Sequence, residues 1–282
     1  MALPTMISVA QLSAMLDQQD LVILDSRFYL ADIHKGQQVY RQGHIPGAVF
    51  VDLHQQLAGT ESEQTGRHPL PEPDAFANTI AELGITADSE VVVYDDMGGA
   101  MAARAWWMLV QQGIQVYVLD GGLPAWQSAG LALESGENMP TKASKRVKVS
   151  FPWQVLEEDV VKNFESDQFQ LLDARASDRF NGENETMDPV AGHIAGALNR
   201  PFSQNLTADG TMKAPALLLD EWSDLLRHVE APIVYYCGSG VTACHNVLAM
   251  NYAGLEAKHI YVGSWSQWSK RMLRQLQGSS GI

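Results

Sequence analysis

Short apolar runs alternate with longer amphipathic stretches along this chain. Four runs are continuous rather than alternating, which is typical of strands buried on both faces. They lie at residues 21–24, 91–94, 116–119 and 233–236. Between them, residues 74–83 and 100–112 have the periodicity of helices, and Ser8 with Gln11 forms a capping-box pattern that predicts a short helix to Leu16. This alternation predicts an α/β protein with mainly parallel sheets covered by helices on both faces.

The same order of landmarks occurs twice. Leu24-Asp25-Ser26-Arg27 corresponds to Leu172-Asp173-Ala174-Arg175, and the Gly-His-Ile segment at 43–48 corresponds to the one at 192–197. The spacing from Asp95 to Trp126 equals the spacing from Cys237 to Trp268, 31 positions in both cases. A repeat of about 145 residues indicates duplicated domains rather than a solenoid of short repeats.

We therefore expect two tandem domains of the same fold, at residues 1–130 and 151–282. The intervening residues 131–150 are polar and contain a cluster of lysine and arginine side chains, so we interpret them as an exposed linker. His44 and His193 occur in both copies and are expected to be architectural. The strand tips differ, with Asp95 in the first copy and Cys237 in the second, so only the second copy carries a nucleophile.

Cys237 follows the run at 233–236 and precedes a Gly-Ser-Gly turn and a predicted helix over residues 244–250. In an open α/β sheet, ligands bind at the carboxyl ends of the strands. Gly238 and Gly240 allow a tight turn whose amides point inward, and the helix N-terminus adds partial positive charge. This setting favours a thiolate and would hold an anionic persulfide. The alternative is a cysteine buried only for packing, which does not need such a turn.

The net charge is −14 and the basic residues form no long runs, which argues against nucleic acid or an anionic membrane as the partner. The two cysteines, Cys237 and Cys244, are spaced neither for a disulfide within one loop and helix nor for zinc. Few cysteines, no signal-peptide pattern and no apolar run of about 18 residues predict a soluble cytoplasmic protein. We expect no metal or organic cofactor.

The two Asp-Ser/Ala-Arg motifs, the two Gly-His-Ile segments and the cysteine loop resemble the tandem-domain sulfurtransferases of the rhodanese superfamily over essentially the whole chain. The neutral loop resembles that of the mercaptopyruvate sulfurtransferases. Its members are Cys237, Gly238, Ser239, Gly240, Val241, Thr242 and Ala243. The resemblance implies that Cys237 takes sulfane sulfur from 3-mercaptopyruvate as a persulfide and releases pyruvate. The acceptor is then a thiol, such as that of thioredoxin, or cyanide.

The resemblance also implies roles for individual side chains. Arg179 matches the arginine that contacts the donor anion, and His68 matches a histidine near the loop serine. Ser239 is expected to relay a proton or to polarise the donor carbonyl, although its hydroxyl could instead bond only the loop backbone. Arg175 is a weaker candidate for donor binding, because Arg27 repeats it and a structural ion pair explains both.

Two departures leave the donor open. The family's second substrate arginine, about nine residues after the first, has no counterpart in the stretch around Thr186, and His54 stands where an aspartate is usual. Thiosulfate:cyanide sulfur transfer is therefore the alternative activity. A phosphatase of this fold would have an arginine at Ala243, the sixth residue after the cysteine. A rhodanese-like module without catalysis would not need Cys237.

Overall fold

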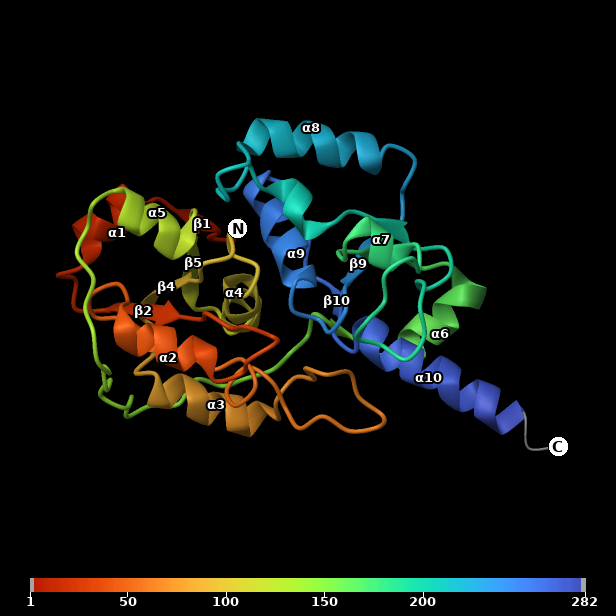
Figure 1. Cartoon of the computed structure of the whole chain (residues 1–282), viewed down its shortest axis with the longest axis horizontal. Coiled ribbons are helices and arrows are strands. Elements are labelled where there is room, and N and C mark those ends of the chain that lie inside the picture. Colours follow the sequence, from red (N-terminus) through yellow and green to blue (C-terminus); the bar gives the residue numbers. More distant parts are fainter. Residues whose placement is uncertain (1–2, 280–282) are drawn as a thin grey trace. The chain divides into compact units, whose positions relative to one another are not determined.

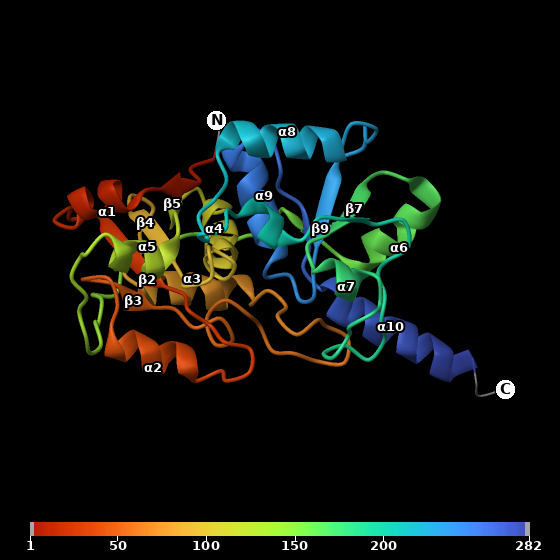
Figure 2. The same cartoon turned by 45° about the horizontal axis from the view of Figure 1, so that its top comes forward.

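The computed structural model describes residues 3–279, which form two compact units (Figures 1 and 2). The first comprises the chain up to Gly59, Pro71–Pro152 and Leu206–Lys213. The second comprises Thr60–Leu70, Trp153–Asn205 and the chain from Ala214 onward. Thr60–Leu70 and Leu206–Lys213 thus fall outside the domains in which the predicted boundaries placed them.

Hydrogen bonds account for both exchanged segments. In the first unit, the Met212 amide donates to the carboxylate of Asp120 at 2.8 Å, which ties the segment Leu206–Lys213 to the end of a strand. In the second unit, backbone carbonyls of Thr60–Leu70 accept from side chains of one helix, as described below. These hydrogen bonds, between residues far apart in the sequence, attach Leu206–Lys213 to the first unit and Thr60–Leu70 to the second.

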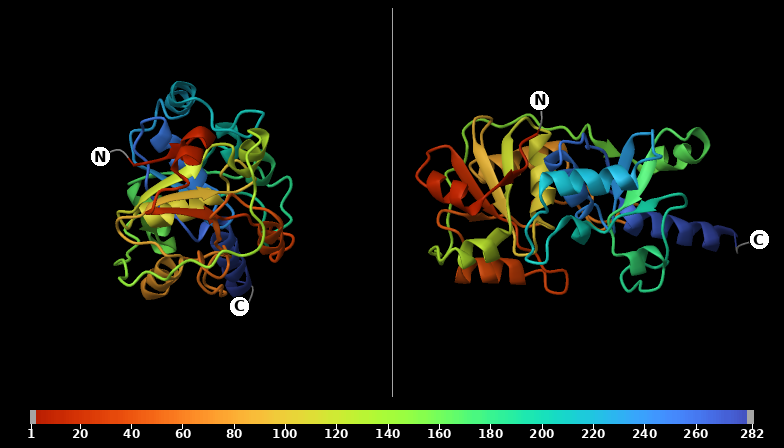
Figure 3. Two further views of the ribbon diagram at one scale, coloured as in Figure 1. Left: turned by 90° about the vertical axis from the view of Figure 1, so that its left-hand side faces the viewer. Right: turned by 90° about the horizontal axis from the view of Figure 1, so that it is seen from above.

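The first unit is built on a five-stranded sheet in the order β1-β5-β4-β2-β3, with every pair parallel. Its strands are β1 (Met6–Ile7), β2 (Leu21–Asp25), β3 (Val49–Phe50), β4 (Glu90–Tyr94) and β5 (Gln115–Leu119). Its helices are α1 (Val9–Met15), α2 (Lys35–Gln42), α3 (Pro73–Glu82), α4 (Ala102–Val110) and α5 (Gly122–Ser128). α1 and α5 cover one face of this sheet, and α2 and α3 lie on the other (Figures 1 and 3).

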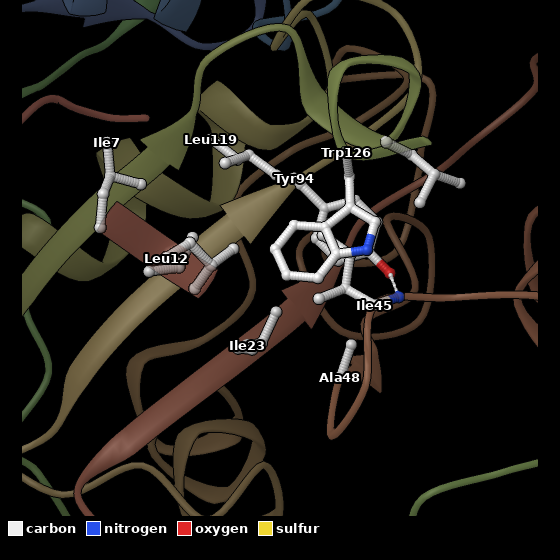
Figure 4. Close-up of a cluster of buried hydrophobic side chains, with 10 residues drawn as sticks. Ile7, Leu12, Ile23, Ile45, Ala48, Tyr94, Leu119 and Trp126 are labelled. Atoms are coloured by element: carbon white, nitrogen blue, oxygen red, sulfur yellow. Dashed lines mark hydrogen bonds between the residues drawn. The ribbon is translucent and has the colours of Figure 1, made fainter. Parts of the chain in front are cut away.

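Side chains from the sheet and from α1 and α5 form one core of this unit. Trp126 and Tyr94 pack together there with aliphatic side chains (Figure 4). The hydroxyl of Tyr94 accepts from the amide of Ile45 at 3.2 Å, so the core also fixes the Gly-His-Ile turn. The capping box of Ser8 and Gln11 is present at the start of α1, as predicted.

The second unit has a sheet of the same topology, β6-β10-β9-β7-β8, again entirely parallel. Its strands are β6 (Gln154–Val155), β7 (Gln170–Asp173), β8 (Leu198–Asn199), β9 (Ile233–Tyr236) and β10 (Ile260–Tyr261). Its helices are α6 (Glu157–Ser166), α7 (Ser177–Phe180), α8 (Pro215–Leu225), α9 (Ala243–Tyr252) and α10 (Ser264–Ser279), with a 3-10 turn at Phe202–Asn205. The predicted fold class, two α/β domains with parallel sheets, is confirmed.

The repeated Asp-x-Arg motifs make the same contacts in both units. Arg27 forms an ion pair with Asp25 and donates to the carbonyl of Gly43 at 2.8 Å. Arg175 does the same with Asp173 and the carbonyl of Gly192, also at 2.8 Å. Each buried arginine therefore joins the end of a strand to the Gly-His-Ile turn, so this part of the motif is architectural.

The two histidines of these turns also make equivalent contacts. His44 stacks on Tyr40 and hydrogen-bonds its carbonyl at 2.7 Å through Nδ1. His193 stacks on Phe180 and bonds its carbonyl at 2.8 Å. Both rings satisfy a carbonyl near the end of a helix, as expected for architectural residues.

Candidate active site

Cys237 directly follows β9 and begins the loop that leads to α9. Figure 2 shows these two elements. Cys237 is only 2% exposed. Its amide donates to Ser264 Oγ at 3.2 Å and its carbonyl accepts from the amide of Trp265 at 3.0 Å, so the start of α10 holds its backbone. The amide of Gly240 lies 3.2 Å from Cys237 Sγ and donates to the sulfur. The thiol is thus buried and already directed at a loop amide.

Gly240 has a backbone conformation that only glycine adopts easily, with φ of +75°. A Cβ at this position would also lie 2.4 Å from the carbonyl oxygen of Val262. Gly238 accepts from the amide of Ser266 at 2.9 Å. The loop is therefore fixed on both sides of Ser239 by contacts to the segment around α10.

The equivalent loop of the first unit binds a carboxylate. At the tip of β4, the fully buried carboxylate of Asp95 accepts four backbone N–H groups at 2.7–2.9 Å. They belong to Met97, Gly99, Met101 and Ala102. Counted from Cys237, the corresponding amides are those of Ser239, Val241, Ala243 and Cys244. The first loop is an anion-binding nest filled by its own side chain.

Ser239 is paired with a histidine distant in the sequence. His68 Nδ1 and Ser239 Oγ share a hydrogen bond of 2.8 Å, and His68 is 2% exposed. The structure therefore places His68 beside the loop serine, where the resemblance located it. His54, in the other unit, packs edge-on against Phe28 with ring centroids 4.9 Å apart.

Arg179, on α7, faces the loop and is held by two acidic side chains. Its Nη2 donates to both Glu185 oxygens at 2.8 and 2.9 Å and to Asp188 at 3.3 Å. Its Nη1 lies 3.6 Å from the point where a Cβ on Gly238 would stand. Arg179 Nε is buried and has no hydrogen-bond partner among the residues that the structure describes. Nη1 of Arg179 thus lies beside Gly238 of the cysteine loop, while the carboxylates of Glu185 and Asp188 bind Nη2.

Glu185 also joins Arg179 to Arg175, which donates to it at 3.3 Å. Burial acts to raise the pKa of Glu185, but hydrogen bonds from Arg179 and from the amides of Met187 and Asp188 lower it below its ordinary value. Burial likewise opposes the charge of Arg175, and Asp173 outweighs it, so the pKa of Arg175 is raised. Arg175 donates to Asp173, to the carbonyl of Gly192 and to Glu185, so these contacts are structural and include the support of Glu185.

Arg67 is a site residue that the sequence analysis missed. Its Nη1 forms an ion pair with Asp188, and its Nη2 lies 3.1 Å from the Cβ position on Gly238. Its amide donates to Ser266 Oγ at 3.1 Å. The available signal was its place directly before His68, in a motif already expected near the loop serine.

Cys244 is fully buried and its thiol donates to the carbonyl of Gly240 at 3.5 Å, so it supports the loop from within α9. Across the residues that the structure describes, no cluster of histidine, cysteine, aspartate and glutamate side chains is arranged to bind a metal ion. Nor does any described helix have the length and apolar character needed to cross a bilayer.

Fold and site together define a two-domain α/β protein with one cysteine at an amide-lined strand tip. A family model for the rhodanese-like domain matches residues 8–129 and again 156–271. The chain therefore belongs to the rhodanese-like family. The predicted family is confirmed, and with it the duplication inferred from the repeated motifs.

Relatives and solved structures agree with this assignment. The chain is 45% identical over 267 residues to a probable 3-mercaptopyruvate sulfurtransferase of Pseudomonas aeruginosa, covering 93% of this chain and 94% of the relative. It is 40% identical over 275 residues to a putative thiosulfate sulfurtransferase of Mycobacterium tuberculosis, covering 94% and 93%. The structure of 3-mercaptopyruvate sulfurtransferase from Leishmania major superposes with a TM-score of 0.86 at 30% identity, covering 99% of this chain and 77% of that one. The predicted enzyme class, a sulfurtransferase, is confirmed.

Proposed function

We propose that this sulfurtransferase moves sulfane sulfur from 3-mercaptopyruvate to an acceptor thiol or to cyanide through a persulfide on Cys237. The observation that carries the proposal is the buried Cys237 thiol, which receives the amide of Gly240 at 3.2 Å beside the hydrogen-bonded pair of Ser239 and His68. A nucleophile, stabilising amides and a proton-transfer pair thus meet at one strand tip.

In the first half-reaction, the thiolate of Cys237 attacks the sulfur of the donor. A sulfur–sulfur bond forms, the carbon–sulfur bond breaks, and its electron pair passes to the methylene carbon of the donor. That carbon gains the proton that the donor thiol gives up, and pyruvate leaves. In the second half-reaction, an acceptor thiolate or cyanide attacks the outer sulfur, and the electron pair of the broken bond returns to Cys237.

The loop amides stabilise the intermediate. The outer sulfur of a persulfide is separated from Cα by the same number of bonds as a carboxylate oxygen of aspartate. Asp95 therefore serves as an internal reference, because its oxygens occupy a nest of the same sequence position in the first unit. Preorganised N–H groups directed at a developing anion are usually the largest catalytic contribution.

Ser239, His68 and Arg179 act on the donor. The Ser239 hydroxyl, bonded to His68 at 2.8 Å, relays the proton between the donor thiol and the methylene carbon or polarises the donor carbonyl. Arg179 binds the donor carboxylate, for which the planar guanidinium fork is suited. The remaining loop residues, from Gly238 to Ala243, supply the amides.

Thiosulfate is the second candidate donor, and the 40% identical relative from M. tuberculosis carries that activity in its name. The loop favours mercaptopyruvate. A side chain at Gly238 would begin 3.1 Å from the cationic Nη2 of Arg67, so a lysine or arginine is disfavoured there. With Ser239 neutral as well, the cysteine loop itself carries no cation and offers a planar keto acid a hydroxyl.

We further propose that the acceptor is a thiol, such as that of thioredoxin, or cyanide, that catalysis needs no cofactor, and that the protein acts in the cytoplasm. Nucleic acid and membrane are not expected partners, given the acidic composition. The proposed domains are 1–130 and 151–282, joined by residues 131–150. The two exchanged segments depart from these bounds, and residues 131–150 belong to the first compact unit. A phosphatase is disfavoured because Ala243 replaces the phosphate-clamping arginine.

The test is kcat/KM for 3-mercaptopyruvate and for thiosulfate, measured side by side with cyanide as the acceptor. We expect a preference for mercaptopyruvate of at least about tenfold, corresponding to about 1.4 kcal/mol in the transition state. After incubation with the donor and no acceptor, mass spectrometry should show one added sulfur on Cys237. Cys237→Ser should abolish both this added mass and the steady-state turnover. A preference for thiosulfate would refute the donor, and turnover by Cys237→Ser would refute the persulfide.

A further inference from the structure

We propose that Arg67 is a second donor-anchoring residue, which binds the anionic end of the sulfur donor together with Arg179. This inference rests on the proposed sulfur transfer at Cys237 and names a specificity-determining residue for it. Arg67 comes from a part of the sequence that precedes the cysteine loop by 170 positions, on a segment that the predicted boundaries assigned to the other domain.

The segment Thr60–Leu70 is fastened to the second unit along one face of α10. Gln267 donates to the carbonyl of Gln64 at 2.7 Å, and Arg274 donates to the carbonyl of Glu63 at 2.6 Å. Lys270 donates to the carbonyls of Ser62 and Thr65 and pairs with Glu61 at 2.6 Å. These three helical side chains are three, four and seven positions apart, so they share one face. The guanidinium of Arg67 is thus carried by an anchored segment.

Gly66 brings this segment into close contact with the backbone of the second unit. A Cβ on Gly66 would lie 2.3 Å from the carbonyl oxygen of Gly263, and the next amide, that of Arg67, donates to Ser266 Oγ at 3.1 Å. Ser266 also donates its amide to Gly238 in the cysteine loop. One residue, Ser266, therefore sets the distance between Arg67 and the loop.

Asp188 places Arg67 and Arg179 side by side. Its side chain is 1% exposed and pairs with Nη1 of Arg67 and with Nη2 of Arg179, the latter at 3.3 Å. A buried carboxylate shared by two guanidinium groups offsets their mutual repulsion. Asp188 lies nine residues after Arg179, in the stretch that contains no arginine. The second cation at this site is therefore supplied from Thr60–Leu70.

Both arginines keep donor atoms on the side of the loop. Nη2 of Arg67 and Nη1 of Arg179 lie 3.1 and 3.6 Å from the same point, the Cβ position on Gly238. Their Nε atoms are both buried without a hydrogen-bond partner among the described residues. A guanidinium has five N–H donors in one plane, and a carboxylate accepts two in parallel. Two such groups converging beside Gly238, the residue after Cys237, form a site for a small anion.

The first test is the steady-state kinetics of Arg67→Gln and Arg67→Lys with 3-mercaptopyruvate. Because a charge-assisted hydrogen bond is lost, we expect Arg67→Gln to raise KM roughly 10- to 100-fold. The kcat should change by less than about threefold, because the nucleophile and its amides are untouched. Arg67→Lys should restore part of the affinity. An unchanged KM in Arg67→Gln would overturn the proposal.

The second test reports on anion binding without any sulfur transfer. Cys237 is alkylated with iodoacetate, which is anionic, and with iodoacetamide, which is neutral and of similar size. In Arg67→Gln we expect the ratio of the two rates to fall by roughly tenfold, with the iodoacetamide rate preserved. If the wild type turned over neither donor while Arg67→Gln still lowered the alkylation ratio, the proposed activity would fail and the role of Arg67 in anion binding would stand. An unchanged ratio would overturn the role of Arg67.

Two control variants separate anion binding from support of the segment. Arg274→Gln removes a tie between α10 and the segment but leaves both guanidinium groups, and Arg41→Gln removes an exposed arginine of the other unit. We expect both to leave KM and the alkylation ratio within about twofold of wild type. If Arg274→Gln matched Arg67→Gln in both measurements, Arg67 would act only through the placement of the segment, and the proposal would be wrong.

Discussion

Replacing Gly240 by alanine should impair catalysis by moving one amide away from the sulfur. Gly240 has φ of +75°, and an added Cβ would lie 2.4 Å from the carbonyl oxygen of Val262. Since real Cβ contacts stay above 3.0 Å, the loop or the strand end has to move by about 0.6 Å. The amide of Gly240, now 3.2 Å from Cys237 Sγ, belongs to the same residue and moves with it.

The expected magnitude has two parts. An alanine in the left-handed region costs about 1–2 kcal/mol of folding free energy. Complete removal of an N–H donor from a transition-state anion costs about 100- to 1000-fold in kcat, and a displaced donor costs less. We therefore expect kcat to fall roughly 10- to 100-fold, which corresponds to about 1.4–2.8 kcal/mol.

The assay should isolate the first half-reaction. Single-turnover mixing of Gly240→Ala with 3-mercaptopyruvate, with pyruvate release as the signal, gives the rate of persulfide formation without any influence of the acceptor. The melting temperature of the same sample measures the folding cost. Donor KM should change little, because Arg179 and Arg67 are not displaced directly.

The duplicated fold supplies a matched control. Gly98 stands at the position of Gly240 in the first unit, counted from Asp95, and has φ of +67°. A Cβ there would lie 2.7 Å from Leu206 Cδ1 and 2.9 Å from the carbonyl oxygen of Gly210. Gly98→Ala should lower the melting temperature comparably and leave kcat near wild type. A kcat of Gly240→Ala within twofold of wild type, or an equal loss in Gly98→Ala, would refute the reasoning.

Three further predictions concern residues around the two loops. Ser239→Ala and His68→Gln should each lower kcat by roughly 10- to 100-fold. The double variant should lose no more than either single variant, because the two side chains act as one relay. Additive losses in a double-mutant cycle would contradict a shared relay. Asp95→Ala should destabilise the protein by about 1–3 kcal/mol in urea unfolding, through loss of an acceptor for buried amides, while the sulfur-transfer rate of the folded protein stays unchanged. Glu185→Gln should be less stable than wild type at neutral pH, because the pKa of Glu185 is lowered in the folded protein. This difference in stability should persist as the pH falls to the ordinary pKa of about 4.3 and shrink below that pH. A difference that grew in acid would contradict a lowered pKa.

The frame of the molecule was predictable because its signals are local or repeated. The continuous apolar runs became the parallel strands β2, β4, β5 and β9, and the capping box opened α1 as expected. The duplicated motifs located equivalent points of two sheets with identical strand order. These features depend on neighbouring residues or on comparison within the chain, which the sequence displays directly.

The composition of the proposed anion site was not predictable in the same way. Arg67 and Asp188 are 121 positions apart, and nothing near either residue announces the pair. The contact depends on the segment Thr60–Leu70 lying on α10, which long side chains such as Lys270 achieve through backbone carbonyls. Carbonyls are present at every residue and leave no mark in the sequence. The sequence after Arg179 therefore indicated that a second cation was missing. In the structure, Asp188 in that stretch forms an ion pair with Arg67.

The first unit also shows that an anion nest alone does not make an active site. Its amides donate to Asp95 at 2.7–2.9 Å. The positions that correspond to the proposed donor-binding and proton-transfer residues carry other side chains. Met97 stands at the position of Ser239, and Ala31 follows Arg27 at the spacing at which Arg179 follows Arg175. In the first unit, the nest thus binds the carboxylate of Asp95, the residue at the end of its own strand. The proposed sulfur transfer needs a nucleophile there, a proton-transfer pair and cations for the donor, and the second unit has candidates for each in Cys237, the pair of Ser239 and His68, and the arginines paired with Asp188.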